Sequence, residues 1–250
     1  MFTPEIREQV RQRVIELARS DTRVTAGAII GSMAYEAGDT WSDIDVTFGV
    51  VNSVRLEVVL DDWTKTLSQE LDVLDYWDLR SGAGIYRVFL LPSGLEVDVS
   101  VTPEEAFGAR GPNFHMLFGT ARKLQPAQSP DASYLIGLCW HHVLHTRACI
   151  ERHKLWQAEY WMSELRNHLL ELACLRLNEN AFHGRGFDRL PAPVKDALAD
   201  ALVCSLNKPE LNRALAVATR CLIDELKKWD APLSARLSPV LQEFGTPQIS

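Results

Sequence analysis

Apolar residues along the first seventy positions recur with two different periods, and the periods predict helices alternating with strands. Spacings of three and four residues predict one helix over about residues 4 to 19 and another that begins at Leu56. Between these helices, Val24 to Ile30 and Ile44 to Val50 are continuous apolar runs, which are typical of buried strands. A short apolar group around Val73 to Trp77 predicts a further strand. The pattern indicates an α/β (α+β) domain built on a small mixed sheet.

Two more strand-like runs, Ile85 to Leu91 and Leu95 to Val101, are separated by the turn residues Pro92, Ser93 and Gly94. They predict a β-hairpin. In its second arm the odd positions are apolar and the even positions are Glu96, Asp98 and Ser100. Because side chains alternate along a strand, we expect one face of this arm to be apolar and the other to carry acids.

From Pro103 to Pro130 the pattern is irregular and rich in glycine and proline, so the domain junction is expected there. The sequence beyond it predicts helices only, over about residues 131–152, 155–179, 192–205 and 209–229. We therefore expect two domains, 1–125 with the sheet and 126–250 as an all-α helical bundle. On the helix predicted for 155–179, Glu164 and Glu171 lie on the face opposite the apolar stripe.

The chain of 250 residues is 46% hydrophobic, which is enough for a sizeable core. No apolar run approaches the ~20 residues that span a bilayer, and the charged N-terminus has no apolar signal segment, so a cytoplasmic protein without a membrane partner is expected. Residues 1–125 hold 12 Lys and Arg against 19 Asp and Glu, and the second half is balanced. That acidic half would repel nucleic acid and favour a small cationic substrate.

The five cysteines are scattered and contain no CxxC pair, which indicates reduced core thiols rather than disulfides. One stripe of a predicted helix carries four side chains of the types that bind zinc, Cys139, His142, His145 and Cys149. A helix rises ~1.5 Å per residue, so these side chains spread over ~15 Å and cannot converge on one ion.

The most informative stretch runs from Gly31 to Asp45. Gly31 and Ser32 follow an apolar strand, where a glycine lets the backbone approach a phosphate and a hydroxyl can bind it. Asp43 and Asp45 are separated by one residue, so on a strand they point to the same face and can share a divalent ion.

The pair Gly31-Ser32 is followed, after ten residues, by Asp43-Ile44-Asp45, with Ser42 directly before Asp43. This arrangement resembles the signature of the DNA polymerase β-type nucleotidyltransferase superfamily. The resemblance implies nucleotide binding by Gly31 and Ser32, two Mg²⁺ ions held by Asp43 and Asp45, and ATP or another NTP as co-substrate. It also implies a third carboxylate on a neighbouring strand. Asp98 matches that position, with Glu96 as the alternative. Family members often have glycine where this chain has Glu36.

An α/β domain followed by a helical bundle is similar to the small-molecule branch of that superfamily, the aminoglycoside and lincosamide nucleotidyltransferases. This likeness implies transfer of a nucleoside monophosphate to a hydroxyl of a small, aminoglycoside-like acceptor, in a cleft between the domains, and hence a role in antibiotic resistance. Some members use a glutamate of the helical half as general base, for which Glu164 is the candidate here and Glu171 the alternative. Either a monomer or a homodimer is compatible with the sequence.

Two other functions stay open. One is transfer of AMP to a protein, as in the minimal antitoxin-type enzymes, although these are typically much shorter. The other is a non-catalytic nucleotide-binding module. Nucleotide binding that is independent of magnesium and unaffected by Asp45→Asn would favour the binding module.

Overall fold

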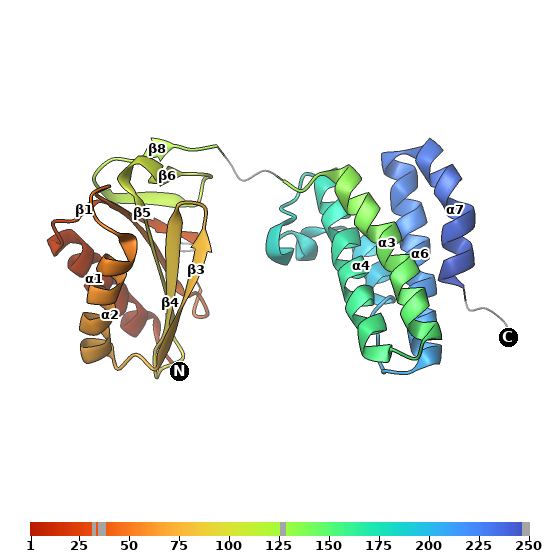
Figure 1. Cartoon of the computed structure of the whole chain (residues 1–250), viewed down its shortest axis with the longest axis horizontal. Coiled ribbons are helices and arrows are strands. Elements are labelled where there is room, and N and C mark those ends of the chain that lie inside the picture. The colour runs from red at the N-terminus through yellow and green to blue at the C-terminus, as the bar shows by residue number, and fades with distance from the viewer. Residues whose placement is uncertain (32–33, 35–38, 126–128, 247–250) are drawn as a thin grey trace. The chain divides into compact units, whose positions relative to one another are not determined.

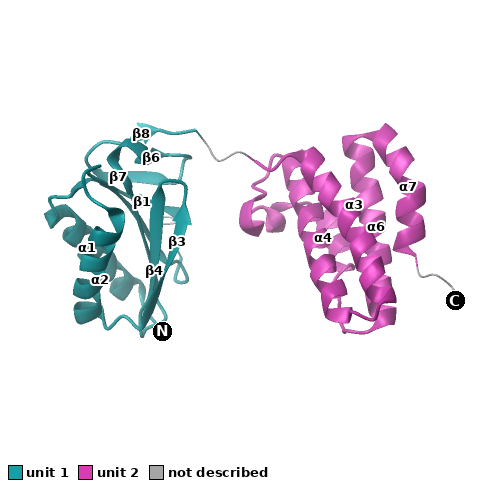
Figure 2. Cartoon of the chain, viewed as in Figure 1, with its two compact units in different colours: residues 1–127 teal, residues 128–250 magenta. Residues whose placement is uncertain are grey.

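The computed structural model describes residues 1–31, 34, 39–125 and 129–246. The chain divides into two compact units, Met1–Ala127 and Gln128–Ser250, and each is described by itself (Figure 2). The first is an α+β unit built on a mixed sheet, and the second is helical.

The first unit consists of a six-stranded sheet and two α-helices, with a separate two-stranded pair (Figure 1). The main elements are α1 (Pro4–Ser20), β1 (Val24–Ile30), β2 (Ile44–Val50), α2 (Leu56–Leu71), β3 (Asp75–Ser81), β4 (Gly84–Leu90), β5 (Glu96–Pro103) and β7 (Phe114–Phe118); β6 (Gly108–Ala109) pairs with β8 (Arg122–Lys123). The strand order is β3-β4-β5-β2-β1-β7. Only β2 and β5 run parallel among these neighbours; the other pairs in the six-stranded sheet are antiparallel. This confirms the two predicted helices, the two strands before Leu56 and the hairpin, whereas the strand predicted around Val73 to Trp77 forms further along the chain, at Asp75–Ser81.

Helices α1 and α2 pack on one face of this sheet and form its core. Thr3 caps α1 by accepting a hydrogen bond from the backbone NH of Ile6, with Pro4 at the first helical position. The alternating apolar residues of β2 and β5 point to the helices, so the polar residues between them are left on the opposite face. The side chains of this core include Val10, Val14, Ile44, Val46, Phe48, Leu60, Trp63, Leu67, Val97, Val99 and Val101.

The opposite face of the sheet is covered at one end and open at the other. Near β1, the buried side chains of Ala26, Ala28 and Phe107 pack together, with Met116 of β7 beside them. At the other edge every residue of β3 is exposed. The polar row on β2 and β5 lies between these two ends.

Strand β7 was not predicted. The sequence around it contains Gly111, Pro112 and Gly119, which indicated an irregular junction, yet Phe114–Phe118 pairs with β1 as the far edge of the sheet. Gly119 has φ of +78° and a Cβ there would lie 2.2 Å from the carbonyl oxygen of Thr25, so this glycine permits the close approach.

The second unit is a helical bundle. Its α-helices are α3 (Ala132–Glu151), α4 (Leu155–Arg176), α5 (Ala192–Ala199), α6 (Lys208–Trp229) and α7 (Ala231–Gly245). The longer helices pack around an apolar core that includes Leu135, Val143, Ile150, Met162, Leu165, Leu211, Leu215 and Leu222. Asn207 caps α6 and Asp230 caps α7 through side-chain oxygens that accept backbone NH groups.

Two helical expectations needed correction. The helix predicted for 192–205 ends at Ala199, and α7 was not predicted because Pro232 and Pro239 interrupt its pattern. Pro232 occupies the first turn, where no hydrogen bond is lost.

The C-terminal end of α7 is held by the buried Arg147 of α3, whose Nε donates a hydrogen bond to the carbonyl oxygen of Phe244 at 2.8 Å.

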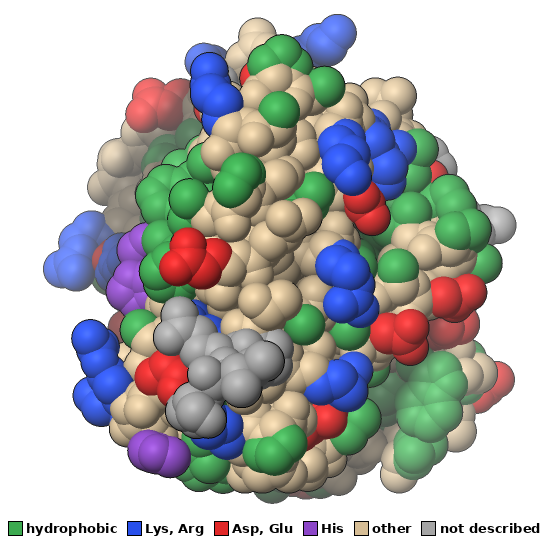
Figure 3. All heavy atoms as spheres, turned by 90° about the vertical axis from the view of Figure 1, so that its right-hand side faces the viewer, with side chains coloured by type: hydrophobic (Ala, Val, Ile, Leu, Met, Phe, Trp, Pro, Cys, Tyr) green, Lys and Arg blue, Asp and Glu red, His purple; other side chains and the backbone are tan. Residues whose placement is uncertain are grey.

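Basic and acidic side chains are interspersed on the face shown in Figure 3. Among the described helices, none has the length and apolar character needed to cross a bilayer.

All five cysteines are free thiols: Cys139, Cys149 and Cys174 are buried as expected, whereas Cys204 is exposed.

Candidate metal centre

Asp45 of β2 and Asp98 of β5 lie directly opposite each other in the parallel ladder. Their apolar neighbours Ile44 and Val97 are buried on the helix-covered face. Because side chains alternate along each strand, both carboxylates therefore lie on the opposite face of the sheet. Two positions more than fifty residues apart in the sequence are thus brought together by strand register.

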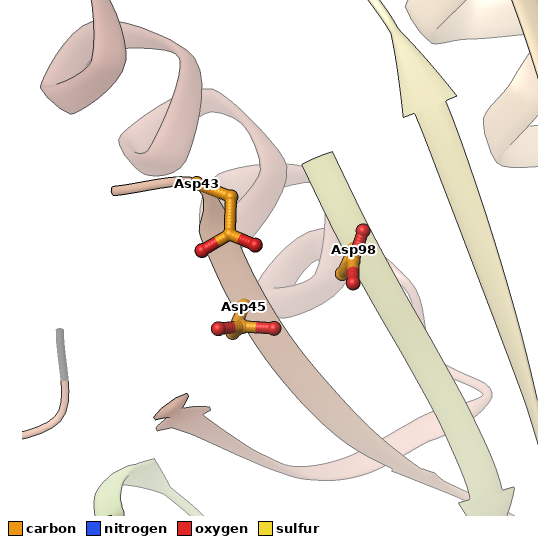
Figure 4. A group of neighbouring side chains, drawn as sticks. All are labelled: Asp43, Asp45 and Asp98. Atoms are coloured by element: carbon orange, nitrogen blue, oxygen red, sulfur yellow. The ribbon is translucent and has the colours of Figure 1, made fainter. Parts of the chain in front are cut away.

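Asp43 completes the group, although it precedes β2 rather than belonging to it. Asp43, Asp45 and Asp98 each offer an oxygen, and these oxygens all lie within 4.8 Å of one another (Figure 4). All three side chains are half-buried. The structure therefore brings together the three predicted metal ligands.

The Asp98 carboxyl has an unfavourable environment as an anion. Burial, followed by repulsion from Glu96 and Asp43, raises the pKa of Asp98 to about 6. Its Oδ1 atom is buried and has no hydrogen-bond partner among the described residues. Such an atom needs either a proton or a cation.

A hard divalent cation fits this donor set. Mg²⁺ prefers oxygen ligands and is usually bound by a small number of carboxylates that leave positions for water and phosphate. Within the described ranges, no other group of three His, Cys, Asp or Glu side chains meets the same distances. Cys139, His142, His145 and Cys149 do not form such a group, as their helical spacing predicted.

Gly31 lies at the end of β1, against the carboxylate of Asp45. Its φ is +72°, and a Cβ atom would lie 2.0 Å from Oδ2 of Asp45. A side chain is excluded here by both backbone conformation and space. Ser32 and Glu36 lie outside the described residues.

Arg7, which the sequence pattern did not indicate as a site residue, positions the segment in front of Asp43. This buried side chain of α1 donates from Nη1 to the carbonyl oxygens of Asp39 and Ser42, the latter at 3.0 Å. Asp39 Oδ1 also accepts the backbone NH of Trp41 at 2.8 Å, which makes a tight turn. An arginine among the apolar positions of the first helix was the available signal.

Glu96, the alternative to Asp98, lies two residues before it on β5. It is exposed and acts on the group by its charge, since it contributes to the raised pKa of Asp98. Glu164 is a half-buried residue of α4 in the helical unit, and its role as a base stays a prediction. The alternative candidate base, Glu171, also belongs to α4, and its Oε2 lies 2.9 Å from Nδ1 of His168.

Comparison with known proteins adds little to this geometry. No family model matches the chain, and no curated protein matches its sequence. The crystal structure of an aminoglycoside 6-adenyltransferase from Bacillus subtilis is similar over 98% of this chain and 99% of its own, with a TM-score of 0.43 and 11% identity. A likeness at that level assigns no activity, so the argument about function rests on the side chains.

Proposed function

We propose that this protein is a magnesium-dependent nucleotidyltransferase. It would move a nucleoside monophosphate, AMP from ATP, to a hydroxyl of a small cationic molecule and release pyrophosphate. The observation that carries the proposal is the convergence of Asp43, Asp45 and Asp98 within 4.8 Å, together with the unpartnered Oδ1 of Asp98. The Gly31-Ser32 and Asp43-Ile44-Asp45 resemblance supports it.

In this proposal Asp43 and Asp45 hold the divalent ions, and Asp98 completes the set. When bound, Mg²⁺ neutralises the triphosphate and stabilises the negative charge on the leaving pyrophosphate. Asp98 has a further task in this proposal, because a carboxylate beside the metal ions can also accept the proton of the attacking hydroxyl. In the proposal the attacking hydroxyl lies next to this half-buried carboxyl on β5.

We assign the backbone at Gly31 to the triphosphate on the strength of the motif resemblance. Glycine is required there because a Cβ atom would lie 2.0 Å from Oδ2 of Asp45, so a side chain would collide with the carboxylate that this proposal uses as a metal ligand. We assign Ser32 as a second phosphate contact on the strength of the motif resemblance.

The acceptor is assigned from charge. The catalytic half carries a formal excess of acids, and the centre itself has three carboxylates with Glu96 beside them. An amine-bearing acceptor such as an aminoglycoside suits this field, and modification of such a compound would confer antibiotic resistance. Residues 126–250, with Glu164 as candidate base, are assigned to substrate binding.

The test is pyrophosphate release with Mg²⁺, each of the four NTPs, and a panel of aminoglycosides and lincosamides. We expect release that depends on one NTP and one acceptor and is abolished by Asp45→Asn or Asp98→Asn. Asp72→Asn is the matched control, because Asp72 is exposed and its left-handed backbone suits asparagine. No release with any acceptor despite NTP binding would contradict the proposal and favour a protein acceptor or a binding module.

A further inference from the structure

The register of the sheet connects the metal centre to its exposed edge. Asp45 lies opposite Asp98, Asp98 lies opposite Val88 of β4, and Val88 lies opposite Trp77 of β3. Residues that pair across neighbouring strands point to the same face. One row of side chains therefore runs from the carboxylates to Trp77, on the face that α1 and α2 leave uncovered.

Apolar and aromatic side chains flank this row at the β3 edge. Leu79 lies opposite Tyr86 in the next row, and Leu90 of β4 belongs to the row on the other side. Trp77 is 57% exposed, Leu79 49% and Leu90 44%. These residues, Trp77, Leu79, Tyr86, Val88 and Leu90, are called the ring platform below.

The charged side chains in the rows of the ring platform are all acidic. They are Asp45, Asp75, Glu96 and Asp98, and Asp43 lies just before β2. The nearby arginines belong to the opposite face, where Arg80 pairs with Glu57 and Arg87 pairs with Asp61 and Asp78. The platform is thus an apolar surface in an acidic field, which suits a cation with an apolar ring.

The position of Gly31 assigns the platform to the acceptor. Strand β1 borders β2 on the side away from β5, so Gly31 and the ring platform lie on opposite sides of the carboxylates. The proposed function places the phosphates against Gly31, and in-line transfer requires the attacking hydroxyl on the far side of the reacting phosphorus. That side is the one that leads from Asp98 to Trp77.

We propose that the ring platform is the acceptor subsite and that Trp77 determines acceptor choice. This inference rests on the proposed function. The acceptor that this subsite favours is a hydroxylated amine that also carries an apolar or aromatic ring, a narrower class than the amine-bearing acceptors of the proposed function. Two strand spacings of ~4.8 Å separate Trp77 from Asp98, so the ring and the reacting hydroxyl are roughly 10 Å apart.

Binding of two matched ligands tests this subsite without turnover. The phenyl and methyl β-glycosides of glucosamine have the same amine and sugar hydroxyls and differ only in the group on the anomeric oxygen, which is an aromatic ring in one and a methyl group in the other. Saturation-transfer NMR titrations with Mg²⁺ and α,β-methylene-ATP present should show that the phenyl glycoside binds at least about fivefold more tightly, as one aromatic contact provides. Trp77→Ala should remove this preference, and Trp77→Phe should keep most of it.

Leu79→Ala and Leu74→Ala form a control pair. Both leucines are exposed, but Leu74 precedes β3 and lies outside the rows of the platform. We expect weaker binding of the phenyl glycoside in Leu79→Ala only, with unchanged thermal stability and unchanged affinity for the nucleotide analogue. A parallel loss in both variants would overturn the proposal.

Equal binding of the two glycosides, or binding of neither, would also overturn it. So would a concentration-dependent dimer that Trp77→Ala dissociates, since a second copy would then be the occupant of the platform. Failure of the proposed function looks different: no acceptor would support pyrophosphate release, whatever the preference between the glycosides.

Discussion

Gly31 and the carboxylate of Asp45 occupy adjoining space, so that a Cβ on residue 31 would lie 2.0 Å from Oδ2 of Asp45. Gly31 directly follows β1, and Asp45 belongs to β2, the neighbouring antiparallel strand. The glycine therefore does two things at once: it adopts φ of +72° and it leaves the carboxylate where it can meet Asp98. Any side chain at position 31 must displace Asp45, which we propose as a metal ligand.

Gly31→Ala should lose most nucleotidyl transfer and bind Mn²⁺ at least about tenfold more weakly, because the methyl group displaces Asp45. Gly94→Ala is the matched control. Gly94 also has positive φ, +79°, but nothing lies within 4 Å of its Cβ position. Both variants carry the backbone cost of about 1 kcal/mol, so calorimetric Mn²⁺ affinity separates the carboxylate contact from strain. Equal affinities in the two variants would contradict this role of Gly31.

Asp98→Asn should stabilise the metal-free protein at neutral pH. The folded-state pKa of Asp98 is raised to about 6, so the folded protein holds its proton more tightly than the unfolded chain does. This carboxyl therefore costs stability as pH rises from about 4 to about 6, by about 1 to 2 kcal/mol when fully ionised. Urea unfolding in EDTA should show that gain at pH 7.5 and none at pH 4.

The control for that measurement is Asp196→Asn, an exposed aspartate of α5, which should show no such pH dependence. Added Mg²⁺ should reverse the ranking at pH 7.5, because only the wild-type protein gains stability from the ion. If Asp98→Asn lowered the free energy of unfolding at pH 7.5 without metal, the ionised carboxylate would not destabilise the folded protein and this account would be contradicted.

Arg87→Met should loosen the edge strand that carries Trp77. The buried guanidinium of Arg87 bonds both oxygens of Asp78 on β3, at 2.6 and 2.8 Å, and also Asp61 of α2 at 2.9 Å. Its loss should cost about 2 kcal/mol of unfolding free energy and speed amide hydrogen exchange along β3. Arg80→Met is the control, since the exposed pair of Arg80 with Glu57 should contribute nothing measurable. Similar exchange rates in both variants would contradict the anchoring role.

His142 should destabilise the protein in mild acid. Burial first, then repulsion from His168, His141 and His145, lowers the pKa of His142 to about 4, and its buried Nδ1 has no hydrogen-bond partner within the described part of the chain. The unfolded chain binds the proton more readily, so stability falls as pH drops from about 6.5 towards 4.

His142→Leu should therefore lose less stability than wild type between pH 7 and pH 5, by about 2 kcal/mol, measured by urea unfolding. His115→Leu is the control, because His115 is exposed on β7. The effects of Asp98 and His142 have opposite signs over overlapping pH ranges, so each must be measured against its own variant. An unchanged pH profile in His142→Leu would contradict this account.

The sequence predicted the parts of the site that depend on local pattern. Period-two alternation placed Asp98 on the polar face of its strand, and the apolar runs before Gly31 and after Asp43 predicted β1 and β2. Local pattern cannot specify which residues pair across strands, so neither the Asp45 to Asp98 register nor the contact of Gly31 with Asp45 could be predicted. The row that ends at Trp77 depends on the same long-range pairing.

Proline and glycine explain the missed elements. Pro239 within α7 removes one backbone donor, yet packing of Leu241 in the bundle core retains the helix. Gly111 and Pro112 precede strand β7, and Gly119 follows it. The local sequence therefore does not favour a strand, which forms because it pairs with β1. Tertiary contacts, rather than local sequence preference, therefore determine that α7 and β7 form.

The most direct test of the proposed chemistry asks which phosphorus atom moves. ATP labelled with ³²P at the α position or at the γ position is incubated with Mg²⁺ and the acceptor, and the acceptor is then isolated. The convergence of Asp43, Asp45 and Asp98 predicts α-label in the acceptor, γ-label in pyrophosphate, and neither product with Asp45→Asn. Label from the γ position in the acceptor, or α-label transfer that persists in Asp45→Asn, would contradict the account.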